Sequence, residues 1–317
     1  MENSNKIYNV GSKNMKIGVI MGGISSEREV SLASGREIMK NIKGENDEVI
    51  EVILNSKSDI FEKVKELDFA LLALHGKYGE DGTVQSILDA MDIPYSGCGM
   101  VSSALCMDKD VAKSLMVSKG IRTAKWQVFK SIEEVTKEKI GILGYPLVVK
   151  PNSGGSSVAT FICKTYEEVL HGVEEGLKVD TMVMAEEFLT GDEITIPMLN
   201  GNILPTLMIK PLKGGFFDYS SKYEEGGAEE TIITYDDNLQ EELHSMAEKS
   251  YEVLRCEVYA RVDFMLKDGI PYILEVNTLP GMTKTSLFPK SAQGIGLDYK
   301  GLLDEIIRAS LALRGHK

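Results

Sequence analysis

The sequence MKIGVIMGG, residues 15–23, determines the fold of the N-terminal part of the chain. Its apolar run ends at a pair of glycines and is typical of a buried β-strand. The spacing Ser26-x-x-Glu29 then predicts a capping box at the start of a helix. Apolar residues predict the buried face of that helix: Val30, Ala33, Ile38 and Ile42. A strand that leads through glycines into a helix is the opening unit of a parallel α/β sheet.

The residues that follow extend this sheet. Further strands are predicted at 49–54 and 69–74, and a helix at 84–91. This alternation indicates a Rossmann-like parallel sheet over about the first 105 residues, with ligands beyond the carboxyl ends of the strands. His75 stands at such an end, as a ligand-facing residue or as a hydrogen-bonded loop histidine. Glu27 is either a partner of the helix dipole or a free carboxylate able to hold a substrate ammonium.

The rest of the chain is predicted to form two further units of mixed strands and helices. The second has strands at 126–129, 147–150, 158–163 and 182–188, with helices from Lys109 and near 132–139 and 166–177. The third has strands at 193–199, 203–210, 258–266 and 272–277, and a helix at 239–254. The fold class is therefore α/β, with α+β character in parts. The expected divisions are a flexible leader at 1–14 and domains at 15–108, 109–191 and 192–317, with a lid loop at 213–230.

Composition excludes several classes of protein. Of the 317 residues 43% are hydrophobic and 26% charged, as in a soluble globular protein. The net charge of −13 argues against a nucleic-acid surface. The four cysteines show no Cys-x-x-Cys spacing, which favours reduced thiols in a cytoplasmic protein. No apolar run approaches the roughly 20 residues of a membrane helix, and we expect no membrane partner.

Two predicted strands near the C-terminus carry polar side chains on matching faces. In PYILEVNTLPGMT, residues 271–283, Glu275 and Asn277 point to one side because strand side chains alternate. Arg261 and Asp263 likewise share a face of the preceding strand, and an Asp-Gly turn joins the two strands as a hairpin. Asp263 and Glu275 lie opposite each other only if the loop between the strands has an odd number of residues or contains a bulge. The patch then suits Mg²⁺ or Mn²⁺, whereas each element alone favours a structural Arg–Asp salt bridge.

Lysines and carboxylates elsewhere are compatible with a nucleotide. VVKPNSGGSSVAT, residues 148–160, brings Lys150 to a strand edge before a glycine- and serine-rich turn whose backbone amides could approach phosphate oxygens. Alone, such a segment is better explained as a hairpin turn. Lys109 opens a helix, and Glu186 and Glu193 in AEEFLTGDE could accept hydrogen bonds from an adenine amino group and ribose hydroxyls. Acidic residues in turns are, however, usually only solvated.

Taken together, these segments resemble the D-alanine–D-alanine ligases of the ATP-grasp family. The resemblance rests on GGISSEREVSLASG, ALHGKYGEDG, GCGMVSSALCMDKD, VVKPNSGGSSV, FDYSSKY, ARVDFML and LEVNTLPGMTKTSL, in that order, from Met15 to about Asp304. It implies a three-domain ATP-grasp fold whose N-terminal domain is the Rossmann-like sheet. It also implies a cytoplasmic homodimer.

The resemblance implies ATP-dependent ligation of two D-alanines for peptidoglycan precursor synthesis, with release of ADP and phosphate. ATP would phosphorylate the first carboxylate, and the second amine would attack the acyl phosphate. Related enzymes use D-serine or D-lactate in place of the second D-alanine. Tyr223 in SSKYEEGG is typical of the dipeptide-forming members. A nucleotide-binding module without catalysis would lack Arg261 or a metal ligand, and none is missing. An ATP-grasp carboxylase does not suit PGMTKTS.

The family roles transfer residue by residue. Glu27 resembles the carboxylate that grips the first ammonium, and Arg261 and the Gly281 N–H resemble the donors to the developing oxyanion. Catalytic and substrate-binding roles are implied for Glu27, His75, Ser156, Lys222, Tyr223, Arg261, Gly281 and Ser286. Nucleotide roles are implied for Lys109, Lys150, Ser156, Glu186, Glu187, Leu189, Glu193 and Lys222. Ligands for two Mg²⁺ or Mn²⁺ ions are implied at Asp263, Glu275 and Asn277.

Overall fold

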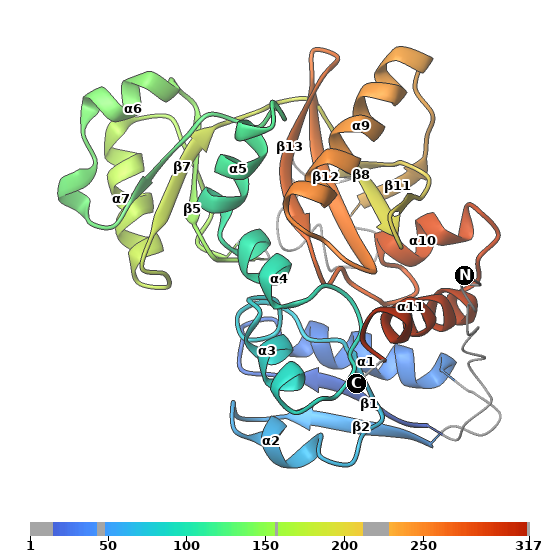
Figure 1. Ribbon diagram of the computed structural model, residues 1–317. Helices are drawn as coiled ribbons and strands as arrows, with labels where there is room; N and C mark the ends of the chain where they lie inside the picture. The colour runs from blue at the N-terminus through green and yellow to red at the C-terminus, as the bar shows by residue number, and fades with distance from the viewer. Residues whose placement is uncertain (1–14, 43–47, 156–157, 212–227, 316–317) are drawn as a thin grey trace, which may run out of the picture.

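The computed structural model describes residues 15–42, 48–155, 158–211 and 228–315. Three β-sheets form three lobes, with α4 and α5 near their junction (Figure 1). The expected leader at 1–14 and most of the expected lid at 213–230 lie outside the described residues. Within the described ranges, no helix is both long and apolar enough to span a membrane.

The first sheet is parallel throughout, as the sequence predicts. Its strand order is β2-β1-β3, and the strands are β1 (Lys16–Gly22), β2 (Glu48–Leu54) and β3 (Phe69–Leu72). The helices of this part of the chain are α1 (Arg28–Asn41), α2 (Asp59–Lys63), α3 (Thr83–Ala90) and α4 (Met100–Met107). The loops after β1 and β3 therefore leave the sheet at one edge, which brings Glu27 and His75 to the same end.

The predicted start of the first helix is wrong in detail. Helix α1 begins at Arg28 with Glu27 as its N-cap residue, and no side-chain hydrogen bond caps it. The capping box expected from Ser26 and Glu29 is therefore absent, because the helix starts one residue too late for it. Ala33 is exposed rather than buried. The buried face consists of Ser31, Leu32, Ser34, Gly35 and Ile38.

The C-terminal helix α11 (Tyr299–Arg314) completes the core of the first lobe. Leu302, Leu303, Ile306 and Ile307 are buried together with residues of β1 and β3. The helix lies beside α1 in Figure 1. The chain thus returns to its first sheet after building the other two. Neither α10 (Leu287–Gln293) nor α11 was predicted from the sequence.

The second sheet is antiparallel, with strand order β4-β7-β5-β6. Its strands are β4 (Trp126–Phe129), β5 (Leu147–Pro151), β6 (Phe161–Cys163) and β7 (Val183–Glu187). Its helices are α5 (Lys109–Ser118), the short 3-10 helix η1 (Ile132–Glu134), α6 (Lys137–Leu143) and α7 (Tyr166–Leu177). The helix expected near 132–139 is therefore split, and the strand expected at 158–163 keeps only its last three residues. α7 agrees with its prediction.

The third sheet has strand order β11-β10-β8-β12-β13, with β9 paired to β8. Its strands are β8 (Asp192–Leu199), β9 (Asn202–Ile203), β10 (Leu207–Pro211), β11 (Ala228–Ile232), β12 (Tyr259–Lys267) and β13 (Ile270–Asn277). Helix α9 (Asp237–Val253) packs on β12 and β13. The strand predicted at 203–210 is divided into β9 and β10. The predicted hairpin of β12 and β13 is confirmed, with positive φ angles at Asp268 and Gly269.

Candidate functional site

Two adjoining cavities gather the predicted site residues that the structure describes. The first is lined by Lys109, Lys150, Glu186, Glu187, Leu189 and Glu193, which are the expected nucleotide residues. The second is lined by Glu27, His75, Arg261, Asn277, Gly281 and Ser286. Six residues line both cavities: Lys109, Gly154, Gly155, Glu193, Asp263 and Glu275. The junction of the cavities therefore lies between the glycine-rich turn and the β12–β13 hairpin. Ser156, Lys222 and Tyr223 lie outside the described residues.

The hairpin meets the geometric condition set by the sequence. Asp263 pairs with Glu275, and Arg261 pairs with Asn277, because a β-bulge shifts the register between Asp263 and Phe264. The two-residue loop alone would place Asp263 opposite Leu274. The bulge therefore brings the polar residues of both strands onto one face, toward the cavities.

Asp263 is held by four hydrogen bonds. Arg261 donates to both carboxylate oxygens, from Nε at 2.8 Å and from Nη2 at 2.7 Å. Asn277 Nδ2 donates at 2.8 Å, and Thr195 Oγ1 donates at 2.6 Å. The salt bridge of the alternative interpretation is thus present. Thr195 was not predicted as a site residue, since a threonine inside a strand carries no distinctive signal.

The donor set at the hairpin suits a hard cation. Asp263 and Glu275 offer carboxylate oxygens and Asn277 a carboxamide oxygen, which are the ligands that Mg²⁺ and Mn²⁺ take. Within the described part of the chain, no three His, Cys, Asp or Glu side chains are grouped closely enough to hold a metal by themselves. Mg²⁺ is usually bound through one or two carboxylates plus phosphate oxygens. The residues present therefore fit a cation that a nucleotide helps to hold.

A buried charge cluster lies at the other end of the first cavity. Both oxygens of Glu186 are engaged by lysines, Oε2 by Lys113 at 2.8 Å and Oε1 by Lys150 at 2.5 Å. Burial alone would raise the pKa of Glu186, but the two lysines lower it to about 2. Burial likewise opposes the charge of Lys150, yet Glu186 and Glu275 raise its pKa above the ordinary value. Glu186 is therefore an ionised hydrogen-bond acceptor at neutral pH.

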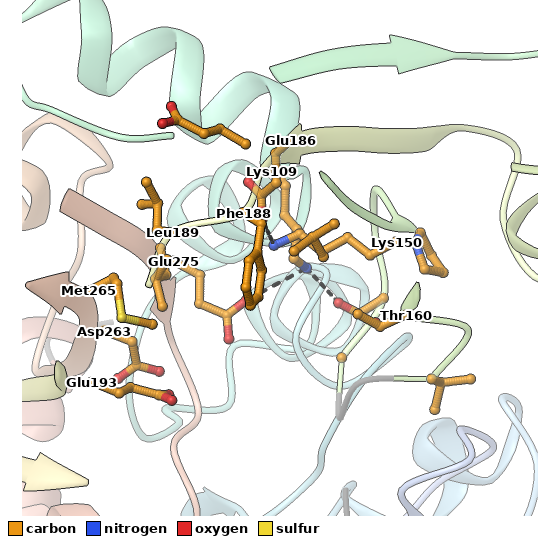
Figure 2. Close-up of a pocket in the computed structure, with 17 residues that line it drawn as sticks. Lys109, Lys150, Thr160, Glu186, Phe188, Leu189, Glu193, Asp263, Met265 and Glu275 are labelled. Carbon is orange, nitrogen blue, oxygen red and sulfur yellow. Dashed lines mark hydrogen bonds and ion pairs between the residues drawn. The ribbon is translucent and has the colours of Figure 1, made fainter. Parts of the chain in front are cut away.

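Lys109 connects the glycine-rich turn to the hairpin. Its Nζ donates to the Gly154 carbonyl at 2.5 Å and lies 3.8 Å from Glu275 Oε2. Burial lowers its pKa, while Glu275 opposes that change. Figure 2 shows Lys109 and Lys150 near the centre of the pocket, with Glu275 between them and the pair Asp263 and Glu193. Two cations thus face the carboxylates across a space suited to phosphates.

Apolar side chains form the walls of the first cavity. Val148 and Phe188 come from the second sheet and its following segment, whereas Met265 and Leu274 come from the third. Glu186 lines the same cavity, so a carboxylate and apolar side chains share its surface. Leu274 is the extra residue of the bulge, so the same irregularity supplies an apolar wall and the polar face. These residues were not predicted, because single apolar residues in strands usually indicate core.

In the second cavity, the carboxylate of Glu27 lies close to two glycines, Gly76 and Gly155. Glu27 is buried, and a Cβ added at Gly76 would lie 2.6 Å from its Oε2. A Cβ at Gly155 would lie 3.1 Å from the same atom. The loop after β3 and the glycine-rich turn therefore meet at Glu27, although they are about 80 residues apart in sequence. The residue after Gly155 is Ser156, the expected partner of Glu27.

His75 is neutral in this setting. Burial, and then the nearby charge of Arg261, lower its pKa to about 4. Its Nε2 lies 3.3 Å from Ser34 Oγ. Glu80, which was not predicted, lies near the same cavity, and burial together with Glu27 raises its pKa to about 8. Its position five residues after His75, in the same quoted segment, is the signal that could have identified it.

Gly281 and Ser286 close the far side of the second cavity. A Cβ at Gly281 would lie 2.9 Å from Ser286 Oγ, so the two residues are in contact. Ser286 Oγ also accepts a hydrogen bond from the Thr283 N–H at 3.0 Å. The segment from Pro280 to Ser286 therefore forms a compact turn, and it lines the second cavity together with Arg261.

Comparison with known proteins identifies the family. Residues 54–98 match the family model of the D-ala D-ala ligase N-terminus, and residues 115–308 match that of the C-terminus. A D-alanine–D-alanine ligase A of Clostridium perfringens is 57% identical over 94% of this chain and 98% of its own length. The ligase of Clostridium beijerinckii is 55% identical over 94% of this chain and 99% of its own.

Solved structures give the same result. A D-alanine–D-alanine ligase of Bacillus anthracis complexed with ATP has a TM-score of 0.86 at 44% identity, covering 95% of this chain and 99% of that one. The VanG D-Ala:D-Ser ligase of Enterococcus faecalis has a TM-score of 0.80 at 32% identity, covering 94% and 100%. The chain therefore belongs to the D-alanine–D-alanine ligase family of ATP-grasp enzymes.

Proposed function

We propose that the protein joins two molecules of D-alanine to D-alanyl-D-alanine and converts ATP to ADP and phosphate. One observation carries the proposal: the residues expected to bind nucleotide and those expected to bind amino acid line two cavities that share Lys109, Asp263 and Glu275. A phosphate transferred between the two ligands would have to pass through that shared region. The family membership and the order of the residues support the same reaction.

The nucleotide end would hold ATP by its base and its phosphates. Glu186 would accept from the 6-amino group, and Lys150 and Lys109 would bind phosphate oxygens. Glu193 would bind the ribose, with Glu187 and Leu189 beside the base. Two Mg²⁺ or Mn²⁺ ions held by Asp263, Glu275 and Asn277 would neutralise the phosphate charge that repels the substrate carboxylate.

The amino-acid end would orient the first D-alanine by charge. Glu27 would bind its ammonium, with Ser156 and Tyr223 as expected partners, and the neutral His75 would stand beside its carboxylate. The carboxylate oxygen attacks the γ-phosphorus, the bond to the bridging oxygen of ADP breaks, and an acyl phosphate forms. Ser286 and Lys222 would bind the carboxylate of the second D-alanine.

Arg261 and the Gly281 N–H would stabilise the next step. When the second amine attacks the acyl phosphate, the carbonyl oxygen gains negative charge, and phosphate leaves as the amide forms. A donor preorganised for such an oxyanion contributes roughly 3 kcal/mol in comparable acyl-transfer sites. Arg261 is fixed by its two bonds to Asp263, so its position does not depend on the substrate.

We also propose the domain limits 15–108, 109–191 and 192–317, a cytoplasmic location and a homodimer. The dimer is inferred from the family. Size-exclusion chromatography with light scattering would test it, and a single peak at the mass of one chain would contradict it.

The experiment that tests the function measures phosphate release and dipeptide formation with ATP, Mg²⁺ and D-alanine. We expect both products with D-alanine and neither with L-alanine. D-Serine and D-lactate, each added with D-alanine, test the related specificities. The curated relatives that are 55–57% identical to this chain are D-alanine–D-alanine ligases, which favours D-alanine at both positions. Release that requires D-serine or D-lactate would overturn this specificity, and no release would overturn the reaction.

A further inference from the structure

Lys113 is a buried cation behind the expected nucleotide site. It lies one turn after Lys109 on α5 and is only 1% exposed. Its Nζ donates to Glu186 Oε2 and to Thr123 Oγ1, each at 2.8 Å, and lies 5.3 Å from the centre of the Trp126 ring. A buried ammonium is costly unless it is paired and hydrogen-bonded, and here all three contacts contribute.

The two lysines on Glu186 occupy different places. Lys150 lines the first cavity together with Glu186, whereas Lys113 does not line it. Lys150 can therefore be drawn toward a bound phosphate, but Lys113 is enclosed by protein. Each carboxylate oxygen can accept about two hydrogen bonds, so Glu186 retains capacity for a ligand while Lys113 remains bound.

The position of Lys113 is also fixed by the third sheet. Thr123 Oγ1 donates to the Ile273 carbonyl of β13 at 2.8 Å, and the Ile273 N–H donates to the Arg122 carbonyl at 2.9 Å. A continuous chain of contacts thus connects Glu186 through Lys113 and Thr123 to the strand that carries Glu275. Glu186 is consequently held in place relative to the hairpin.

We propose that Lys113 is a positioning residue that makes the site selective for a purine with a 6-amino group, by holding Glu186 as an ionised acceptor. An ionised carboxylate only accepts hydrogen bonds, so it binds the 6-amino group of adenine and repels the 6-oxo group of hypoxanthine. When a bound phosphate holds Lys150, Lys113 is the cation that remains on Glu186; without Lys113, burial then favours the protonated carboxyl, which can donate to a 6-oxo group. The inference rests on the proposed role of Glu186 at the base.

The test compares ATP with ITP, which differ at that group. Affinities are measured by calorimetry, and kcat and KM by phosphate release, for native protein and for Lys113→Met. We expect the preference for ATP over ITP to fall at least about tenfold in the variant, chiefly through nucleotide affinity and KM. The KM for D-alanine should stay within a few-fold of native. Lys119→Met, an exposed change at the end of the same helix, is the matched control and should keep the native preference.

Two further variants keep the inference falsifiable. Lys113→Gln retains a donor without the charge, so it should fold if Lys113→Met does not, and should change the preference in the same direction. In a Glu186→Gln background, Lys113→Gln should cause no further change in preference. Equal losses for ATP and ITP, or an additional change in that background, would overturn the inference. Binding separates this outcome from failure of the proposed reaction, because the affinities can be measured even if no dipeptide forms.

Discussion

Replacing Glu275 by glutamine separates a catalytic role from a structural one. The change keeps the size of the side chain and removes its negative charge. Glu275 is opposite Asp263 on the hairpin, and Lys109 Nζ lies 3.8 Å from its Oε2. Its side chain is 31% exposed. The carboxylate is thus placed for a ligand role, and it contributes to packing only modestly.

The expected magnitudes differ between folding and catalysis. A partly exposed ion pair at this distance contributes about 0–1 kcal/mol to stability. For a chain of 317 residues this lowers Tm by about 2 °C or less. Lys109 also keeps its bond to the Gly154 carbonyl, so its charge is not left without a partner. Loss of an anionic ligand from the phosphoryl-transfer site should instead cost about 3 kcal/mol, or about 100-fold in kcat.

The assay is phosphate release at saturating ATP, Mg²⁺ and D-alanine, alongside a thermal melt. Glu66→Gln is the matched control, because Glu66 pairs with Lys16 at 2.6 Å on the surface. It should leave kcat unchanged. If Glu275→Gln turns over within about threefold of native, the metal role is refuted. If the Tm of Glu275→Gln instead falls by more than about 5 °C and unfolding of the variant explains the lower rate, the role of Glu275 is structural.

Three further predictions concern stability. Burial lowers the pKa of His75 from 6.5 to about 4, so the unfolded chain binds more protons between these values and stability rises with pH there. When the pH is lowered from 7 to 5, the free energy of unfolding measured in urea should fall by about 2 kcal/mol more for the native protein than for His75→Gln. Equal losses would show that the pKa of His75 is not lowered in the folded protein. Gly76→Ala combines φ +72° with a Cβ 2.6 Å from Glu27 Oε2, and denaturant unfolding should show a loss of about 1–3 kcal/mol. Leu302→Ala should lose about 2–5 kcal/mol, and the exposed Leu313→Ala less than about 0.5; similar losses would mean that α11 does not belong to the first core.

Much of the fold followed from periodicity and turn chemistry. The parallel first sheet could be predicted because its strands are short apolar runs ending in glycine or polar residues. The hairpin could be predicted because Asp268-Gly269 joins two alternating strands. The face shared by Arg261 and Asp263 followed from strand geometry alone. The bulge that makes the faces match could be stated only as a condition, since it depends on packing against neighbouring strands.

Other features depend on contacts distant in sequence. The strand expected at 203–210 breaks where the chain changes its pairing partner from β8 alone to β8 and β11. Helix α11 is buried only because the first sheet, more than 200 residues earlier, lacks a cover there. The local sequence around Lys113 is typical of an amphipathic helix with an exposed lysine. Lys113 is buried where it pairs with Glu186 on β7, and no local sequence pattern reveals that contact.

The bulge in the β12–β13 hairpin also limits how this segment can change in length during evolution. Removing Leu274 would restore a regular ladder in which Asp263 still lies opposite Glu275 and Arg261 opposite Asn277, so the polar face would remain and the first cavity would lose one apolar wall residue. A single residue inserted into β13 would instead need a second irregularity, because the bulge already holds one extra residue. Adding or removing two residues would keep every side chain on its present side. Loss of one residue from β13 should therefore leave the polar face intact, whereas natural variants that gain one residue should have lost activity or acquired a compensating irregularity.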